Sequence, residues 1–432
     1  MAGGLGTRMR SSVPKHLHPL LGRRMVDWVV ETARELGTEP VVVASPDTAD
    51  AYSGPEVVVQ EQPLGTGDAV RCARAALERA GADEVLVLSG DTPLLTAGLL
   101  RGLLDAHRSA GAAATVLSFV PDDLRNYGRV LRDESGGVRA IVEALDATPE
   151  QLEVRECNSS IYVFRADALW PALEELRPHN AQGELYLTDA VVSLVAADEP
   201  VAAYVAPDPV ETQGVNTRAE LATAAAALRD RINLGHLLAG VTIVDPATTW
   251  IDPTVEVEQD VVVHPFTVLR GETRVGAGAE IHAHTVAVDA SIGEGASVGP
   301  FCYLRPGTVL DEQAKAGTFV EIKNSHIGAR TKVPHLSYMG DAELGHDTNV
   351  GAGAITANFP HRPGQPKGRT TIGSNVRTGI HNGFIAPVTV GDDAWIAAGS
   401  VITEDVPPGA LAIAREPQIN KEGYAARERS GD

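Results

Sequence analysis

The 432-residue sequence predicts two domains of different architecture: an α/β domain with a Rossmann-like, mostly parallel sheet, followed by a left-handed parallel β-helix. Two observations support this prediction. Short apolar runs alternate with helical stretches up to about residue 218, and from about residue 241 aliphatic residues recur at every sixth position. A chain of this length accommodates two domains, so we expect residues 1–218 and 241–432 to fold separately, joined by residues 219–240.

The α/β domain is predicted from buried strands that alternate with amphipathic helices. Residues 67–81 and 96–111 have the apolar spacing of helices. Strands separated by helices usually pair in parallel, which is why we expect a mostly parallel sheet. The strand candidates are the apolar runs at 40–44, 84–88, 113–117 and 161–164.

Glycine placement and periodicity define the rest of the chain. Residues 219–240 contain neither Gly nor Pro before Gly235, so they predict one linker helix. Beyond it, the period of six is typical of a hexapeptide β-helix, in which three hexads make one triangular coil. The rhythm breaks near 311–336 and 358–370, where we expect loops that leave the coil. The first anchors of the repeat are Ile251, Val257, Val263, Leu269, Val275 and Ile281.

Composition narrows the class of function. The net charge of −21 argues against a nucleic-acid partner, because binding to a phosphate backbone depends on clustered Lys and Arg. No apolar run has the length of a membrane span, so we expect no membrane contact. The three cysteines lie too far apart for a disulfide framework or a CxxC metal site, and we expect a cytoplasmic protein.

A glycine-rich loop at residues 2–10 is the first chemical motif. Glycines allow the backbone to approach phosphates closely, while Arg8 and Lys15 supply positive charge for a triphosphate. A second loop at residues 60–69 follows an apolar run and offers Gln60 to a base edge. The alternative for this second loop is an ordinary strand-to-helix turn.

Asp91 is the first candidate for a Mg²⁺ ligand. It comes just after a predicted strand, and ligands bind at the carboxyl ends of strands in open α/β sheets. Phosphoryl transfer from a nucleoside triphosphate needs Mg²⁺ held by few protein oxygens, and Asn216 is the second candidate. The alternative for Asp91 is an N-cap of the helix expected near 96–106.

The β-helix carries the second chemical motif, at 319–325 and 333–342. Acetyl transfer from a thioester to an amine needs a base, and His335 is the candidate, with Lys323 and Arg305 available for a phosphate. A surface histidine is the alternative for His335. His282 and His284 alternate along one strand and would point the same way, but no third metal ligand has obvious spacing, so we expect solvated histidines.

The order of these motifs resembles the GlmU family, the bifunctional N-acetylglucosamine-1-phosphate uridylyltransferases/glucosamine-1-phosphate acetyltransferases, over nearly the whole chain. The resemblance implies acetyl transfer from acetyl-CoA to glucosamine 1-phosphate. It also implies uridylyl transfer from UTP to N-acetylglucosamine 1-phosphate, with release of pyrophosphate. Mg²⁺ as cofactor and a homotrimer formed through the β-helix are further implications.

The resemblance also gives each matching residue a role. Arg8 and Lys15 would stabilise the pentacoordinate phosphorus, and His335 would be the general base of acetyl transfer. In the α/β domain it implies that UTP is held by Gly4, Arg8, Lys15, Gln60, Gly65 and Thr66, the sugar by Gly128, Glu143 and Asn158, and the metal by Asp91 and Asn216. In the β-helix it implies that Arg305, Lys323, Tyr338 and Asn349 bind glucosamine 1-phosphate, that Asn358 orients the substrate, and that Ala398 and Arg415 line the acetyl-CoA channel.

The sequence departs from the family pattern at several positions. The family places a hydrophobic strand before the glycine-rich loop, so we expect this domain to lack its first strand. Asp68 stands where the family usually has His, and Ser159-Ser160 replace a Thr-Gly-like pair beside the sugar. Phe359 and Ile380 replace polar residues of the acetyl site, and an insertion follows at 360–367. The alternatives are a nucleotidyltransferase for another sugar or base with a regulatory or weakly active β-helix, and a scaffold without activity.

Overall fold

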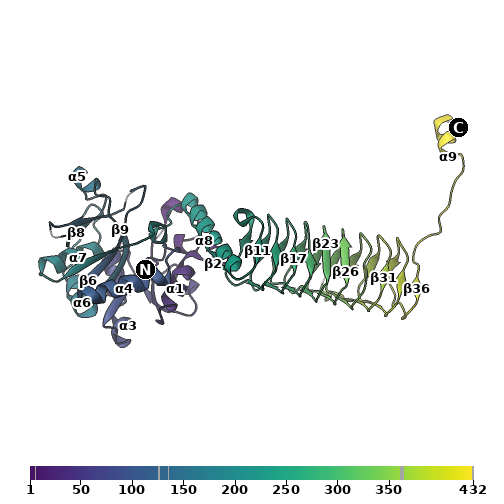
Figure 1. Cartoon of the computed structure of the whole chain (residues 1–432), viewed down its shortest axis with the longest axis horizontal. Helices are drawn as coiled ribbons and strands as arrows, with labels where there is room; N and C mark the ends of the chain where they lie inside the picture. The colour runs from purple at the N-terminus through teal and green to yellow at the C-terminus, as the bar shows by residue number, and fades with distance from the viewer. Residues whose placement is uncertain (5, 125–126, 135, 361–363, 431–432) are drawn as a thin grey trace. The chain divides into compact units, whose positions relative to one another are not determined.

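The computed structural model of the chain describes residues 1–4, 6–124, 127–134, 136–360 and 364–430. The chain forms two compact units, Met1–Leu228 and Arg229–Asp432, each with a hydrophobic core (Figure 1). The boundary between them falls inside helix α8 (Arg218–Leu238).

The first unit is built around a six-stranded sheet in which β9 (Cys157–Arg165) is antiparallel to β5, β6 and β7. Because β5 and β6 both pair with β9, they run in the same direction, and β10 is parallel to β6. The four strands expected from the apolar runs are all present, as β3, β5, β6 and β9. The remaining bounds are β1 (Pro19–Leu20), β2 (Arg23–Arg24), β3 (Val41–Ala44), β4 (Glu56–Val59), β5 (Glu84–Val87), β6 (Ala114–Phe119), β7 (Arg129–Arg132), β8 (Val138–Val142) and β10 (Val201–Val205).

Helices of this unit bury one apolar face. In α4 (Ala97–Ala110) the Thr96 hydroxyl accepts a hydrogen bond from Leu99 N at the start, and Gly111 ends the helix at φ +56°. The helix expected at 67–81 is divided into α2 (Thr66–Cys72) and α3 (Arg74–Arg79). The other helices are α1 (Met25–Arg34), α5 (Pro149–Leu152), α6 (Ala166–Glu174) and α7 (Leu187–Ala196). Within the described ranges, none of the chain's helices combines the length and the apolar character of a membrane span.

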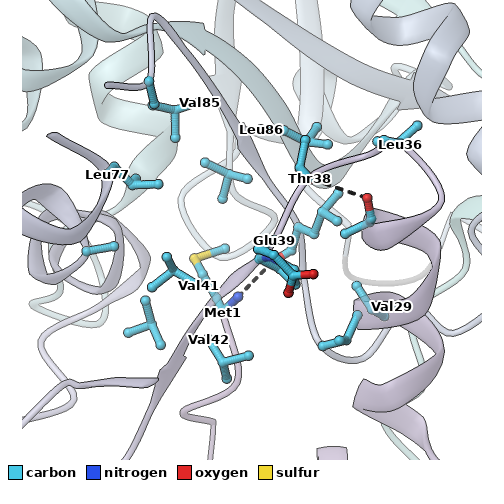
Figure 2. Close-up of a pocket in the computed structure, with 18 of the residues that line it drawn as sticks. Met1, Val29, Leu36, Thr38, Glu39, Val41, Val42, Leu77, Val85 and Leu86 are labelled. Atoms are coloured by element: carbon cyan, nitrogen blue, oxygen red, sulfur yellow. Dashed lines mark hydrogen bonds between the residues drawn. The ribbon is translucent and has the colours of Figure 1, made fainter. Parts of the chain in front are cut away.

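The first two residues of the chain lie in the gap between β3 and β5. Ala2 N donates to Val43 O at 2.7 Å, the Met1 amine donates to Leu88 O at 2.8 Å, and Gly90 N donates to Met1 O at 2.8 Å. Toward the amino ends of the two strands the gap continues as a cavity of about 660 Å³, lined mostly by apolar side chains (Figure 2). A strand extending upstream from Met1 would enter this cavity with the unpaired edges of β3 and β5 on either side.

The second unit is a left-handed parallel β-helix whose faces are three parallel sheets (Figure 1). The first face contains β11 (Thr242–Ile243), β14 (Val262–Val263), β17 (Glu280–Ile281), β20 (Ser297–Val298), β23 (Lys315–Thr318) and β26 (Lys332–His335), and continues through the bridges of Asn349 into β31 (Arg377–Thr378), β34 (Trp395–Ile396) and β36 (Leu411–Ala412). The second contains β12 (Trp250–Ile251), β15 (Val268–Arg270), β18 (Val286–Val288), β21 (Tyr303–Leu304), β24 (Glu321–Lys323), β27 (Tyr338–Gly340), β29 (Ile355–Ala357), β32 (Gly383–Ile385) and β35 (Val401–Ile402). The third contains β13 (Glu256–Val257), β16 (Arg274–Val275), β19 (Ser291–Ile292), β22 (Val309–Leu310), β25 (His326–Ile327), β28 (Ala342–Leu344), β30 (Thr370–Ile372) and β33 (Val388–Val390). A short helix, α9 (Tyr424–Ser430), follows the coil.

One of the two expected breaks in the coil is wrong. Residues 311–336 form regular strands, because their inward positions are still small or aliphatic: Ala316 and Val333 are fully buried beneath Val298. The spacing between stacked residues is eighteen from Val298 to Ala316 and seventeen from Ala316 to Val333, as it also is from Ile281 to Val298. Each step of seventeen moves the anchors out of the six-residue phase. The break at 358–370 is confirmed over its described residues, since β29 ends at Ala357 and β30 begins at Thr370.

Candidate active sites

The predicted nucleotide-binding residues lie next to the ends of strands in the first unit, where β4 pairs with β3 in a two-stranded parallel sheet beside the six-stranded sheet. Asp91 comes after β5, Gln60 directly follows β4, and Asn158 lies near the start of the antiparallel β9, opposite Ser118 near the end of β6. The carboxyl ends of parallel strands and the amino end of an antiparallel strand meet at the same edge. The fold therefore places these residues at the edge where open α/β sheets bind ligands.

The glycine-rich loop packs tightly against Lys15. Gly6 has φ +62°, and a Cβ at this position would lie 2.4 Å from the Lys15 Cβ, so only glycine allows the approach. A Cβ on Gly4 would meet no atom within 4 Å, which shows that this part of the loop faces open space. The loop thus fixes Lys15 on one side and leaves the backbone around Gly4 accessible to a ligand.

Lys15, Asp91 and Asn216 form the centre of the first site. The Lys15 ammonium donates to Asp91 Oδ2 and, at 2.9 Å, to Asn216 Oδ1, and the Arg8 guanidinium donates to the same Asn216 oxygen at 3.0 Å. Ser89 Oγ donates to Asp91 Oδ1 at 2.6 Å. Burial alone would raise the pKa of Asp91, but the charge and hydrogen bond of Lys15 and the hydrogen bond of Ser89 outweigh it and lower that pKa. The N-cap alternative for Asp91 is wrong, because Thr96 caps α4.

Gln60 is held in one orientation by Asp68. Its Nε2 donates to Asp68 Oδ2 at 2.9 Å and to Gly65 O at 3.1 Å, and Arg71 donates to Asp68 Oδ1 at 2.5 Å. Gln60 Oε1 is turned toward the glycine-rich loop, 3.5 Å from the position of a Cβ on Gly3. The amide therefore presents an acceptor oxygen, not a donor, to the space beside that loop.

Gly65 and Thr66 connect the second loop to the start of α7. Gly65 has φ +116°, and a Cβ there would lie 2.5 Å from Leu185 O. The Thr66 hydroxyl accepts from Leu187 N at 3.0 Å. The loop does join strand β4 to helix α2, as the alternative of a strand-to-helix turn expects, and it also contacts a segment more than one hundred residues away.

Gly128, Glu143 and Asn158 lie close together at the same sheet edge. Asn158 N donates to Gly128 O at 2.9 Å, and a Cβ on Gly128 would lie 3.3 Å from Glu143 Oε2. Burial raises the pKa of Glu143, with further contributions from Asp146 and Asp189. Ser160, one of the two residues that depart from the family pattern here, has φ +63°, a conformation that favours glycine.

A basic cluster lies on the second face of the β-helix. Lys323 and Arg305 occupy successive coils with Tyr338 beside them, since the Tyr338 hydroxyl lies over Gly340 and Gly340 pairs with Lys323. Lys367 joins this cluster from the 358–370 loop, and its ammonium lowers the pKa of Lys323. Sequence reasoning missed Lys367 because it lies in the insertion, where no repeat position marks it.

Asn358 belongs to the same cluster through Asp341. Its Nδ2 donates to Asp341 Oδ2, while Asn324 Nδ2 donates to Asp341 Oδ1 at 2.5 Å. Burial would raise the pKa of Asp341, but the two amides and the charges of Lys367 and Lys323 lower it on balance. A carboxylate held between two amides next to two lysines can keep those lysines in place for an anionic ligand.

The other predicted residues of the acetyl site lie elsewhere on the coil. His335 ends β26 and is exposed, directly before the corner between the first and second faces. Asn349 lies on the first face, in a groove of about 480 Å³ that also contains Lys332 and Arg377. Ala398 is exposed on that face, and the Arg415 side chain lies 3.7 Å from the position of a Cβ on Gly399. One chain therefore distributes these residues over two faces, with His335 at the edge between them.

His282 and His284 do not point the same way, contrary to the expectation from their spacing. β17 ends at Ile281, and His284 lies at a corner with φ +60°, where its ring stacks between Phe266 and Phe301 at centroid distances of 4.7 Å. His282 instead faces His264 of the preceding coil, with ring centroids 5.3 Å apart.

An α/β sheet that gathers a glycine-rich loop, a lysine and a buried carboxylate at one edge defines a nucleotidyltransferase, here joined to a β-helix of the acyltransferase type. In agreement, the family model of the MobA-like NTP transferase domain matches residues 1–191. Curated relatives named "Bifunctional protein GlmU" match the whole chain. The protein of Streptomyces coelicolor is 50% identical over 457 aligned positions, which cover 100% of this chain and 94% of the relative. For Streptomyces avermitilis the identity is 48%, with 100% and 94% covered, and for Mycobacterium bovis it is 46%, with 100% and 92% covered.

The chain belongs to the GlmU family of bifunctional proteins. It is a bifunctional transferase of UDP-N-acetylglucosamine synthesis, with an acetyltransferase and a uridylyltransferase activity. Its nucleotidyltransferase activity requires a divalent metal ion.

Proposed function

We propose that uridylyl transfer takes place at the sheet edge of the first unit, with Lys15 and Arg8 on the triphosphate of UTP. The observation that supports this most is the position of the Lys15 ammonium between the oxygens of Asp91 and Asn216. Gln60, Gly65, Thr66 and the backbone at Gly4 would hold the rest of the nucleotide.

The cluster of Gly128, Glu143 and Asn158 would hold N-acetylglucosamine 1-phosphate at the same edge. Its phosphate oxygen attacks the α-phosphorus of UTP, the bond to the β-phosphate breaks, and pyrophosphate leaves. The attacking group is already an anion, so the reaction needs positioning and positive charge and no protein nucleophile. Lys15 and Arg8 supply that charge.

Asp91 and Asn216 fit a Mg²⁺ ion. Both oxygens converge on one cation in the structure, the Lys15 ammonium, and Mg²⁺ in such sites takes one or two protein oxygens in addition to phosphates and water. Bound there, Mg²⁺ would neutralise phosphate charge. Because the same oxygens now hold Lys15, we expect Lys15 to release them and turn to the triphosphate when substrate and metal bind.

Acetyl transfer is proposed for the basic cluster of the β-helix. Arg305, Lys323 and Lys367 would bind the phosphate of glucosamine 1-phosphate, next to Tyr338. His335 would take a proton from the sugar amine, the amine nitrogen attacks the acetyl carbonyl of acetyl-CoA, and the coenzyme A thiolate leaves. Asn349, Ala398 and Arg415 would contribute from the first face.

A homotrimer would bring the two faces together. A ladder of exposed side chains at one corner of the coil, formed by Phe266, His284, Phe301, Phe319 and Leu336, supports this proposal. The four apolar members are 48–60% exposed in one chain, and a continuous apolar strip of this kind is typical of a protein interface. The three free cysteines, two of them buried, support a cytoplasmic location.

The first test is pyrophosphate release from UTP and N-acetylglucosamine 1-phosphate in the presence of Mg²⁺. We expect Lys15→Met to lower kcat/KM by at least about 10²-fold, because it removes the central cation of the site. The matched pair is Arg8→Met and Arg10→Met, which remove the same charge from the same loop, although only Arg8 bonds to Asn216. Equal rates for Lys15→Met and wild type would contradict the proposal.

The second test is acetyl transfer, followed by release of the coenzyme A thiol. We expect His335→Ala to lower kcat by about 10²–10⁴-fold while pyrophosphate release is unchanged. His346→Ala, at an exposed histidine of the same unit, is the control. Retained acetyl transfer in His335→Ala would show that the β-helix uses another base.

A further inference from the structure

We propose that the first face of the β-helix binds one divalent transition-metal ion, of the Zn²⁺ type, through His264, Glu280 and His282. One ligand atom from each residue lies within 4.8 Å of the other two. His264 Nε2 is 2.9 Å from Glu280 Oε1, and His282 Nδ1 is 3.6 Å from the same oxygen. This site is separate from the Asp91 centre and from the acetyl cluster, and it does not rest on either proposed reaction.

The fold itself brings the three side chains together. Val262 and Val263 pair with Glu280 and Ile281, so His264 and His282, the next residues along, are neighbours on adjacent coils. Glu280 and His282 alternate along one strand direction and therefore point to the same side of the sheet. The two histidines are eighteen residues apart, which is one full coil. This spacing, and not the nearer pair His282–His284, is the sequence feature that indicates the site.

The geometry suits a tetrahedral ion. Ligand bonds of about 2.0–2.2 Å in a tetrahedron require ligand atoms about 3.4 Å apart, and the two distances to Glu280 lie on either side of this value. Two imidazoles and one carboxylate, with a fourth position for water, form a ligand set that Zn²⁺ uses in proteins. Imidazole ligands favour Zn²⁺, Cu²⁺ or Ni²⁺ over Mg²⁺, so the ion of the first unit would not compete here.

A fourth residue orients one of the ligands. His282 Nε2 lies 3.2 Å from Ser297 Oγ on the next coil, which leaves Nδ1 to face Glu280 and the metal position. A hydrogen bond to the ring nitrogen that does not bind the metal fixes the orientation and the tautomer of a metal-binding histidine. The histidine side chains are 31% exposed and that of Glu280 48%, so an ion can enter from solvent and the fourth position stays open to water.

His326, several coils further along the β-helix, provides a contrast. Its Nδ1 and Nε2 face Glu343 and Asp311, at 2.6 and 2.8 Å, so the two carboxylates lie on opposite sides of one ring. Both ring nitrogens are used as donors there, and hydrogen bonds and charges of the two acids raise the pKa of His326 despite its partial burial. That arrangement stabilises a protonated imidazole. The ligand atoms of His264, Glu280 and His282 instead converge on one point, which suits a metal ion.

The test uses the full chain, treated with EDTA and then titrated with Zn²⁺ by calorimetry and with Co²⁺ by visible absorption. We expect wild type to bind one more Zn²⁺ per chain than His264→Gln, and Co²⁺ to give tetrahedral absorption bands that His264→Gln and Glu280→Gln lack. His346→Gln, which removes an exposed histidine elsewhere on the coil, should bind as wild type does.

Because the three residues lie on the outer face, the variants should keep the far-ultraviolet circular dichroism and the pyrophosphate release of wild type. Equal Zn²⁺ stoichiometry and affinity in wild type and His264→Gln would overturn the proposal, as would wild-type binding in Glu280→Gln. We expect Zn²⁺ to raise the thermal midpoint of wild type. If Zn²⁺ does not raise the midpoint of His264→Gln, this would support a metal bridge between the two coils.

Discussion

Filling the cavity between β3 and β5 should stabilise the first unit. The perturbation is an extension of about four apolar residues placed before Met1, of the type Val-Val-Val-Leu. Both flanking strands are four residues long, so an extension of this length, about 13 Å at 3.3 Å per residue, runs along both edges. The cavity of about 660 Å³ is lined by side chains of these strands and of the neighbouring helices (Figure 2).

The expected gain is a few kcal/mol. Burial of each aliphatic side chain stabilises by roughly 1.5–3 kcal/mol. Ordering each added residue costs about 1.5 kcal/mol. Four residues therefore leave a net gain of very roughly 3 kcal/mol, with strand hydrogen bonds in addition. For a unit of this size each kcal/mol moves the midpoint by about 2–4 °C, so we expect a shift of about 6–12 °C.

Scanning calorimetry of the full chain measures the effect, because the first unit should give its own transition. The matched control is a Gly-Ser extension of equal length, which also converts the Met1 amine to an amide but carries no apolar side chains. If the apolar extension is no more stable than the Gly-Ser extension, the gap does not accept a strand and the reasoning is refuted.

Four further predictions follow from single groups. Burial lowers the pKa of the Met1 amine from 8.0 to about 6, so the folded chain binds fewer protons than the unfolded chain between these pH values. The free energy of unfolding should therefore rise by up to ~2.7 kcal/mol from pH 6 to pH 8. Urea unfolding should show this pH dependence in wild type and not in the Gly-Ser extension. Asp68→Asn should lower the ratio of kcat/KM for UTP over CTP about tenfold or more, because Gln60 is then free to turn its amide; an unchanged ratio would show that Asp68 does not set the base preference. Lys367→Met should raise KM for glucosamine 1-phosphate several-fold with little change in kcat, and the opposite pattern would place Lys367 in the chemical step. Ser160→Gly should raise the free energy of unfolding by about 1 kcal/mol, since it relieves a positive φ, and destabilisation in the same urea titration would contradict this.

The sequence predicted the architecture well because both units repeat a simple pattern. Buried strands such as β3 and β5 are uninterrupted aliphatic runs, and the inward positions of the coil recur with a spacing of seventeen or eighteen residues. The prediction was wrong at 311–336, where Ala316 takes a position filled by larger residues elsewhere and the coil shortens by one residue. Small changes of period of this kind are visible only after the coils are stacked.

The sequence predicted some residues of the candidate sites and missed others. Motif residues next to strand ends, such as Lys15, Asp91 and Asn216, meet as expected because the sheet edge collects them. Lys367 could not be predicted, since its place depends on the path of a loop that no repeat constrains. The His264–His282 pair is predictable from the sequence once residues eighteen apart, one full coil, are compared.

The cavity affects the stability of the first unit more than the geometry of its site. Met1 and Ala2 already make the backbone hydrogen bonds that join the glycine-rich loop to Val43, Leu88 and Gly90. Gly90 directly precedes Asp91, and Gly6 packs on Lys15, so both ends of the Lys15–Asp91 pair are fixed by these first residues. The empty space lies beyond them, along the amino-terminal parts of β3 and β5. The apolar extension should therefore change the thermal midpoint strongly, while kcat for pyrophosphate release at 25 °C should stay within about twofold of wild type; a rate that rises tenfold with the extension would show that the loop is held loosely without it.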